Sequence, residues 1–202
     1  MNDTKSILLV GVGGQGTILA SKLLTLGLLE AGYDVKMSEI HGMSQRGGSV
    51  SSQVRYGTDV QSPVIEKGGA DILVAFERME ALRWLDHVKP EGQVVVCDTA
   101  IESMPMKVGK AIYSKEIIQE LKSRIKTRVI PAVELAKELG NERVMNVILL
   151  GALVRSMGLE SIDWNQLIAD QVKPKFVALN HQAIQIGMDQ VSKKELSHST
   201  AV

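Results

Sequence analysis

A glycine-rich turn between a strand-like run and a helix-like run constrains the fold more than any other feature of the chain. Residues 7–10 are four consecutive apolar residues, as in a buried strand, and residues 17–29 are compatible with a helix. Between them, Gly11, Gly13 and Gly16 have the G-x-G-x-x-G spacing. Such glycines let the backbone turn tightly and bring its N–H groups close to an anion at the helix N-terminus. Because this spacing alone is a weak motif, a turn that binds nothing stays an alternative.

The composition excludes several kinds of protein. Basic and acidic side chains balance at 23 each, and only 3% of the residues are aromatic. A nucleic-acid-binding protein more often has a basic surface and stacking aromatic residues, so we expect no nucleic-acid partner. Cys97 is the only cysteine, too few for an internal disulfide or for an iron–sulfur cluster, which typically needs about four. The lack of a signal-like N-terminus and of an apolar run of about 18 residues predicts a cytoplasmic protein without a membrane partner.

Strand-like and helix-like runs alternate along the chain, which predicts a three-layer α/β/α sandwich. After the first strand and helix, strands are expected at 33–38, 49–56, 71–76, 93–98 and 128–130, with a short one near Ala111. Further helices are expected at 77–88, 115–122, 132–139, 141–157, 163–172 and 176–188. We expect a single domain over residues 1–191, followed by a polar tail at 192–202.

The connection between the second and third strands predicts a mixed sheet. The loop at 39–48 has about ten residues and no helical pattern, whereas a parallel crossover needs about a dozen or more. The third strand is therefore expected to run antiparallel in a Rossmann-like, mostly parallel sheet, and its alternating pattern predicts a half-exposed strand. Glu39 follows the glycines by about 20 residues, where an NAD-binding fold has its ribose-binding carboxylate, although here it opens a glycine-rich loop.

The loop at 39–48 is a second candidate for chemistry. It leaves from the same carboxyl edge of the sheet as the glycine turn, so the two are expected to face one site. Arg46, beside backbone N–H groups, is suited to hold a phosphate or a carboxylate. A surface loop with a solvated arginine is the alternative. For His41, a hydrogen bond within the loop is favoured over a role as general base.

Two further features concern helices. The stretch at 144–154 is apolar on nearly every side, which indicates burial within this domain or against another chain. Asn146 lies inside it, and a buried amide needs partners within the core or in another subunit. Glu77 and Arg78, directly after a strand, suit either a ligand or the start of a helix.

The two loops resemble a known family. The strings GVGGQGT at 11–17 and SEIHGMSQRGGSV at 38–50 are similar to the gamma domain of 2-oxoacid:ferredoxin oxidoreductases. Segments at 70–77 and 80–85 most resemble the beta subunits of indolepyruvate ferredoxin oxidoreductases, and those at 146–152 and 180–187 extend the match to roughly residues 5–190. The HGMSQRGG string is more specific than the glycine turn. Ser44 departs from this pattern, which has Ala at that place.

The resemblance implies a subunit of an enzyme that oxidatively decarboxylates a 2-oxo acid, such as indolepyruvate or another aryl pyruvate, to an acyl-coenzyme A and passes electrons to ferredoxin. In that family, thiamine diphosphate and the iron–sulfur clusters lie on a partner subunit. The resemblance makes two groups of residues candidates for lining the active site or the coenzyme A path, or for contacting the partner. They are Gly11, Gly13, Gly14, Gln15 and Gly16 in the turn, and His41, Gln45, Arg46, Gly47 and Gly48 in the loop. No catalytic residue and no metal ligand is assigned, and a homodimer is left open.

Two alternatives belong to other classes. One is a free-standing dehydrogenase that binds NAD(P) or a flavin, which the glycine turn and Glu39 favour. The other is a non-enzymatic module that binds an adenine nucleotide or coenzyme A in the same cleft. Composition and periodicity do not separate these from the oxidoreductase subunit; the resemblance favours the subunit.

Overall fold

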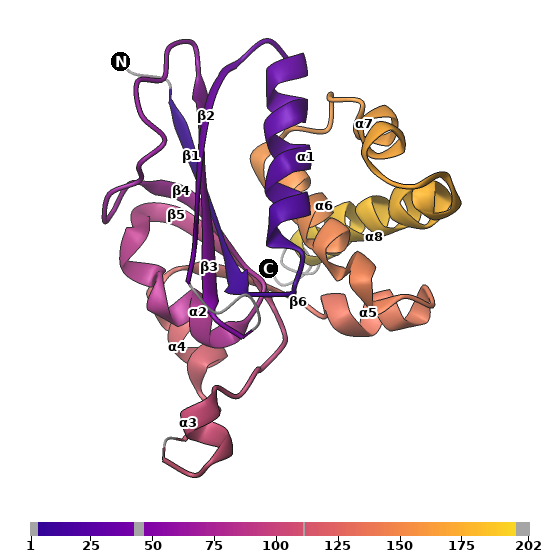
Figure 1. Cartoon of the computed structure of the whole chain (residues 1–202). Helices are drawn as coiled ribbons and strands as arrows, with labels where there is room; N and C mark the ends of the chain where they lie inside the picture. The colour runs from indigo at the N-terminus through magenta and orange to yellow at the C-terminus, as the bar shows by residue number, and fades with distance from the viewer. Residues whose placement is uncertain (1–3, 43–46, 111, 197–202) are drawn as a thin grey trace.

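One six-stranded mixed sheet forms the centre of the fold (Figure 1). The computed structural model describes residues 4–42, 47–110 and 112–196. The strands are β1 (Lys5–Val12), β2 (Asp34–His41), β3 (Ser49–Gly57), β4 (Ala70–Ala75), β5 (Val88–Cys97) and β6 (Lys126–Ile130), in the order β2-β3-β1-β4-β5-β6. β3 pairs antiparallel with both β1 and β2, and the pairs β1–β4, β4–β5 and β5–β6 are parallel. The predicted antiparallel third strand is confirmed, because its connection to β2 is too short for a parallel crossover.

Helices cover both faces of this sheet, so the predicted three-layer sandwich is also confirmed (Figure 1). One face carries α1 (Thr17–Glu30), α5 (Ala132–Glu138), α6 (Met145–Met157), α7 (Trp164–Gln171) and α8 (Val177–Leu196). The other face carries α2 (Arg78–Arg83) and α4 (Ile117–Arg124). α3 (Met104–Lys107) projects from the lower end of the molecule in Figure 1. Short 3-10 turns lie at Leu85–His87, Glu142–Val144 and Pro174–Phe176.

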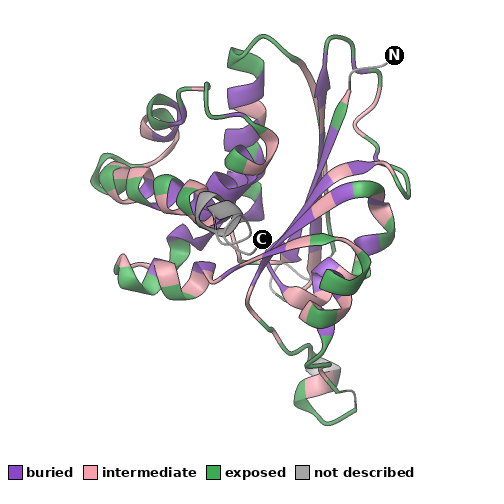
Figure 2. Cartoon of the chain, turned by 180° about the vertical axis from the view of Figure 1, so that it is seen from behind, coloured by how far each residue is buried: buried purple, intermediate pink, exposed green. Residues whose placement is uncertain are grey.

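The central strands are apolar on both sides because a helix layer lies on each face (Figure 2). Along β1, Ile7 and Leu9 pack into the core beneath α1 and α6, whereas Leu8 and Val10 pack into the core beneath α2 and α4. This division follows from the period of two along a strand, which sends successive side chains to opposite faces. A near-continuous apolar run is therefore required in a strand that both layers cover.

The structure corrects the sequence-based prediction for β3. Most of β3 is buried, including Ser51, Ser52 and Gln53, because the strand lies between β1 and β2 and is not at an edge. The buried side chain of Gln53 is hydrogen-bonded, since its Oε1 accepts the N–H of Ile65 at 2.6 Å. The partly exposed edge strand is β2 instead.

Other boundaries also differ from expectation. The helix expected at 77–88 ends at Arg83 as α2, and β5 starts at Val88, earlier than predicted. Residues 89–92, between the helix expected at 77–88 and the strand expected at 93–98, belong to β5, whose register against β4 shifts between Ala70 and Ile72. Ala111, in the expected short strand, lies outside the described residues, and 112–114 form no strand.

The apolar helix α6 is buried within this chain, which answers one of the open questions. It crosses α8 so closely that a Cβ on Gly151 would lie 2.1 Å from the Ile184 carbonyl oxygen, and one on Gly187 would lie 1.9 Å from that of Ile148. Only glycine permits this approach. α8 continues to Leu196, five residues into the segment expected to be a tail, and residues 197–202 lie outside the described part of the chain.

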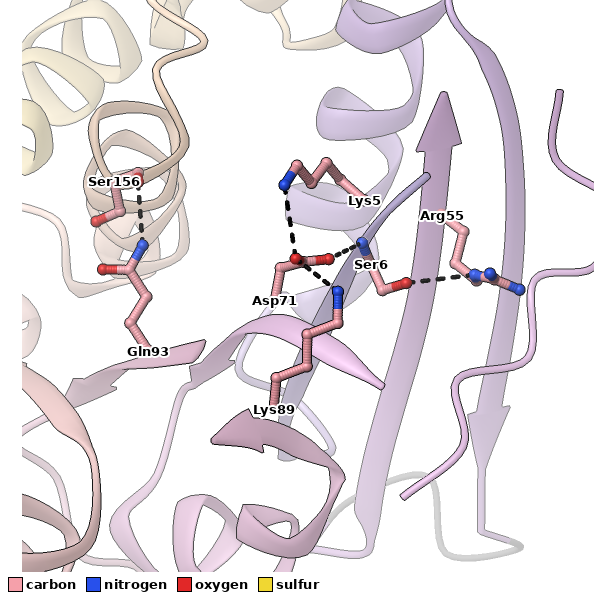
Figure 3. A network of polar contacts seen from close by, with 7 residues as sticks. All are labelled: Lys5, Ser6, Arg55, Asp71, Lys89, Gln93 and Ser156. Atoms are coloured by element: carbon pink, nitrogen blue, oxygen red, sulfur yellow. Dashed lines mark hydrogen bonds and ion pairs between the residues drawn. The ribbon is translucent and has the colours of Figure 1, made fainter. Parts of the chain in front are cut away.

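Side chains hold together the edge of the sheet where the parallel strands begin (Figure 3). The carboxylate of Asp71, near the start of β4, accepts the Ser6 N–H at 2.8 Å. It also pairs with Lys89 Nζ at 2.8 Å and with Lys5 Nζ at 3.8 Å. Arg55 Nε donates to Ser6 Oγ at 3.3 Å. This amino edge is therefore closed by charges, and the glycine turns lie at the opposite edge.

Candidate functional site

The two glycine-rich loops meet at the carboxyl edge of the sheet. Gly13 N–H donates to the carbonyl oxygen of Gly48 at 2.8 Å, and Gly47 N–H donates to that of Gly13 at 3.4 Å. These bonds continue the β1–β3 ladder, which ends where Val12 faces Ser49. These hydrogen bonds confirm that the two loops lie side by side at the carboxyl edge of the sheet. Of the predicted residues, Gln45 and Arg46 lie outside the described part of the chain.

The turn after β1 has an unusual backbone that its sequence permits. Gly14 and Gly16 have φ values of 104° and 80°, in the region that favours glycine, and Gly16 is the residue that precedes α1. At Gly11, a Cβ would lie 2.9 Å from the Cβ of Phe76, so this position needs glycine for close packing. The first N–H groups of α1 lack partners within the helix, as at any helix start, and lie beside the turn.

Gln15 braces the turn. Its Oε1 accepts the N–H of Val12 at 2.7 Å, and its Nε2 donates to the carbonyl oxygen of Phe76 at 2.8 Å. Phe76 N–H in turn donates to Val10 at 2.8 Å. The amide group therefore ties the turn to the end of β4, and both of its ends are engaged within the chain.

Asn146 supports the turn from below. Its Nδ2 donates to the carbonyl oxygen of Gly16 at 3.2 Å, and its Oδ1 accepts the N–H of Val147 at 2.8 Å. The open question about its partners is thus answered within this chain. A Cβ on Gly16 would lie 2.5 Å from Asn146 Nδ2. The glycine therefore leaves room for the Asn146 amide, although the two residues are 130 positions apart in the sequence.

Cavities flank the glycine turn on two sides. The larger, of about 700 Å³, is lined among others by Gly14, Gln15, Gly16, Thr99, Arg143 and Asn146. The smaller, of about 450 Å³, includes Gly13, Gly14, Gly16, Ile18, His41 and Val50 in its lining. The larger cavity is bordered by the backbone of the turn and by two exposed side chains of opposite charge, Glu142 and Arg143.

His41, the last residue of β2, is exposed and lines the smaller cavity beside the exposed side chain of Ile18. It lies opposite Val50 in the β2–β3 ladder. The structure therefore places this predicted residue next to the glycine turn.

Two buried carboxylates at the start of α2 hold the surrounding loops. Glu77 caps α2 by accepting the N–H of Glu80 at 3.0 Å, which favours the structural alternative for this residue. Glu80 accepts the Ser49 hydroxyl at 2.5 Å and pairs with Arg83 at 2.9 Å, so it fixes the end of the second loop to α2. Burial raises the pKa of the Glu80 carboxyl above its ordinary value.

Several residues of the larger cavity carry no signal that predicts them from the sequence. Thr99 and Ile101 follow β5, and Arg143 lies in the 3-10 turn before α6. Their signal in the sequence is weak, because each is an ordinary residue that the topology brings to the carboxyl edge. Asn146 gave the one usable signal, as an amide inside an apolar helix.

Among the described residues, no group of three or more histidine, cysteine, aspartate or glutamate side chains is placed to hold a metal ion. No helix in this part of the chain is long and apolar enough to cross a membrane.

A Rossmann-like mixed sheet with two glycine loops joined at its carboxyl edge defines the class of α/β domain, and comparison with known proteins gives the family. The chain belongs to the pyruvate ferredoxin/flavodoxin oxidoreductase family, which matches residues 6–190. It is 38% identical over 190 residues to indolepyruvate oxidoreductase subunit IorB of Pyrococcus horikoshii, covering 91% of this chain and 94% of that protein. The resemblance found in the loops is confirmed.

Solved structures share the fold. The gamma subunit of a keto/oxoacid ferredoxin oxidoreductase from Geobacter sulfurreducens matches with a TM-score of 0.69 and 23% identity, over 94% of this chain and 99% of that one. A 2-oxoglutarate:ferredoxin oxidoreductase from Magnetococcus marinus matches with a TM-score of 0.73 and 20% identity, over 96% of this chain but only 32% of that one. In the second case the fold is one part of a longer polypeptide.

Proposed function

We propose that this chain is the subunit without redox cofactors of an indolepyruvate or aryl-pyruvate:ferredoxin oxidoreductase in the cytoplasm. In this proposal a partner subunit holds thiamine diphosphate and iron–sulfur clusters, forms the acyl-coenzyme A and passes electrons to ferredoxin. The substrate class is taken from the 38% identical IorB protein, whose name specifies indolepyruvate. The single cysteine, Cys97, agrees with clusters carried elsewhere, since it is buried in β5 and has no cysteine companion.

The observation that carries the proposal is the pair of glycine loops joined by two backbone hydrogen bonds, from Gly13 N–H to Gly48 and from Gly47 N–H to Gly13. They leave exposed backbone beside a cavity of about 700 Å³, with Arg143 at its rim. We propose that this cavity receives an anionic part of coenzyme A, because N–H groups at a helix start and a guanidinium both favour phosphate. A Cβ on Gly14 would meet nothing within 4 Å, so a ligand has direct access to that backbone.

The chain's role in this proposal is to bind and orient. Backbone hydrogen bonds join Gly13 to Gly47 and Gly48 across the two loops. The side chains of Gln15 and Asn146 hold the turn in place through hydrogen bonds to Val12 and Gly16. Such support from buried hydrogen bonds keeps a binding loop in place without a covalent role. Acid–base chemistry and electron transfer are then tasks of the partner.

Reconstitution tests the proposal. The partner subunit, purified separately, is given indolepyruvate, coenzyme A and oxidised ferredoxin, with or without this chain. We expect acyl-coenzyme A formation and ferredoxin reduction to need both subunits. Full turnover by the partner alone would contradict the proposal.

The dinucleotide-binding alternative has a specific difficulty. In this sheet β3 lies between β1 and β2, so Glu39 on β2 is separated from the glycine turn by an additional strand. One strand spacing is about 4.8 Å, which moves the carboxylate away from where a bound ribose would lie. Calorimetric titration with NAD(H), NADP(H) and FAD distinguishes the two: micromolar affinity would favour the dehydrogenase.

A further inference from the structure

A projecting arm, of which the structure describes residues 102–110 and 112, leaves the carboxyl edge and returns to it at one buried carboxylate. The N–H of Ile101, before the arm, donates to Glu77 Oε1 at 3.1 Å, and the hydroxyl of Tyr113, after it, donates to the same oxygen. Glu77 is only 1% exposed. Both ends of the arm are therefore fixed at a single point, while α3 between them projects from the body of the fold (Figure 1).

The arm exposes apolar side chains that the described part of the chain, residues 4–42, 47–110 and 112–196, leaves uncovered. Ile112 is 92% exposed and Val108 is 59% exposed. Lys107 and Lys110 are exposed on the same segment and outnumber its one acidic residue, the exposed Glu102, so the arm carries a small net positive charge. Isolated exposed apolar residues are common, but two on a short projection with fixed ends are suited to insertion into a partner.

The root of the arm belongs to the candidate site. Ile101 lines the cavity of about 700 Å³ at the glycine turn. It also lines a cavity of about 530 Å³ together with Gly47, Gly48, Glu80 and Lys107. A protein that binds the arm would therefore lie over the rim of both glycine loops.

We infer that the arm docks into an acidic-rimmed apolar groove on the thiamine diphosphate-binding subunit, with Ile112 and Val108 as the anchoring side chains. This inference rests on the proposed function. The charge of Lys107 and Lys110 fits an acidic rim. The Magnetococcus marinus chain, in which this fold is 32% of a longer polypeptide, favours further parts of the oxidoreductase over a second copy of this chain as the occupant. Glu77 is the positioning residue, because it fixes both ends.

Binding of the purified partner subunit by biolayer interferometry tests the inference. We expect the double variant Val108→Asp/Ile112→Asp to weaken the affinity by more than about tenfold, as for central interface residues. Val64→Asp, on a side chain that is 57% exposed outside the arm, is the matched control and is expected to stay within about twofold. Thermal unfolding verifies that each variant is folded, and Val108→Ser/Ile112→Ser gives a second reading without added charge.

Two more variants test the positioning and the charge. Tyr113→Phe removes one of the two bonds to Glu77, and we expect a several-fold weaker affinity because the arm must then be ordered on binding. Lys107→Gln/Lys110→Gln is expected to slow association and reduce its dependence on salt.

The outcomes separate the two proposals. If the wild-type chain restores turnover but the arm variants bind the partner as well as it does, the inference about the arm is wrong and the proposed function stands. Loss of self-association without loss of partner binding would also overturn it. If the wild-type chain neither binds the partner nor restores turnover, the proposed function fails and the arm inference fails with it.

Discussion

The two edges of the sheet are built in opposite ways. At the amino edge, Asp71 collects a backbone N–H and two lysines, so that charged side chains close the fold (Figure 3). At the carboxyl edge, Gly13 and Gly48 join two loops through backbone alone. In the proposed function, the amino edge contributes stability, and the carboxyl edge binds a ligand or partner because the backbone of its glycine loops stays accessible.

Three side chains beneath the carboxyl edge hold the glycine loops in place. Gln15, Asn146 and Glu80 are each buried or partly buried, and each holds one of the loops with its side chain. The loops therefore need few side chains of their own at the surface.

Removing the central carboxylate of the amino edge is expected to have the largest effect on stability. Asp71→Ala leaves Lys5, Lys89 and the Ser6 N–H without their shared acceptor, and we expect a loss of about 2–4 kcal/mol in the free energy of unfolding, measured in urea. Turnover of the folded protein with its partner is expected to be unchanged. Asp59→Ala at an exposed position is the control; equal losses for both variants would show that the network does not stabilise this edge.

A side chain at the base of the glycine turn is expected to affect both stability and turnover. Gly16→Ala adds a Cβ at φ 80° and 2.5 Å from Asn146 Nδ2, so we expect a cost of about 2–3 kcal/mol. The turn must also shift, which lowers turnover in the reconstituted assay. A variant with wild-type stability would contradict the described fit between Gly16 and Asn146.

A matched pair of glycines separates backbone strain from function. Gly14 and Gly32 have φ values of 104° and 86°, and a Cβ on either would meet nothing within 4 Å. We expect Gly14→Ala and Gly32→Ala to cost a similar amount, about 1–2 kcal/mol. Only Gly14→Ala, in the turn, is expected to reduce turnover; Gly32 lies at the far end of α1. Equal turnover in both variants would remove the turn from the functional site.

The smallest effect concerns the pH dependence of stability. Burial raises the pKa of Glu80 above its ordinary value of 4.5, so the folded state holds this proton more tightly than the unfolded state. The associated stability is fully present below pH 4.5 and is lost as the pH rises through the raised pKa. We expect Glu80→Gln to remove that part of the decline in urea unfolding between acidic and neutral pH. An unchanged pH profile would contradict the assignment, with Glu91→Gln at an exposed position as the control.

Much of the fold was predictable because its signals are local. The apolar run of β1, the glycines after it and the short 39–48 connection together predict a mixed α/β sheet with an antiparallel third strand. The predicted end at 157 and start at 163 match α6 and α7 closely, because Gly158 follows α6 with a φ of 69° and Asp163 caps α7 by accepting the N–H of Gln166. The burial of β3 was not predictable, because polar residues such as Gln53 indicate exposure until a distant partner, here Ile65, is known.

The candidate site was predictable only in part. The two glycine loops carry a sequence signal, and the topology brings both to one edge. Arg143, Thr99 and Ile101 come from other strands and turns, and nothing local distinguishes them. The roles of Gln15 and Glu77 as supports depend on contacts with residues 61 and 36 positions away, which the sequence alone does not reveal.

Amide hydrogen exchange tests the division between the two edges most directly. The exchange of this chain is measured alone and in complex with its partner subunit. We predict increased protection at residues 12–18, 47–50 and 99–113, on the carboxyl edge, and unchanged exchange around Lys5, Asp71 and Lys89. Protection confined to the amino edge, with the glycine loops exchanging as in the free chain, would contradict this account.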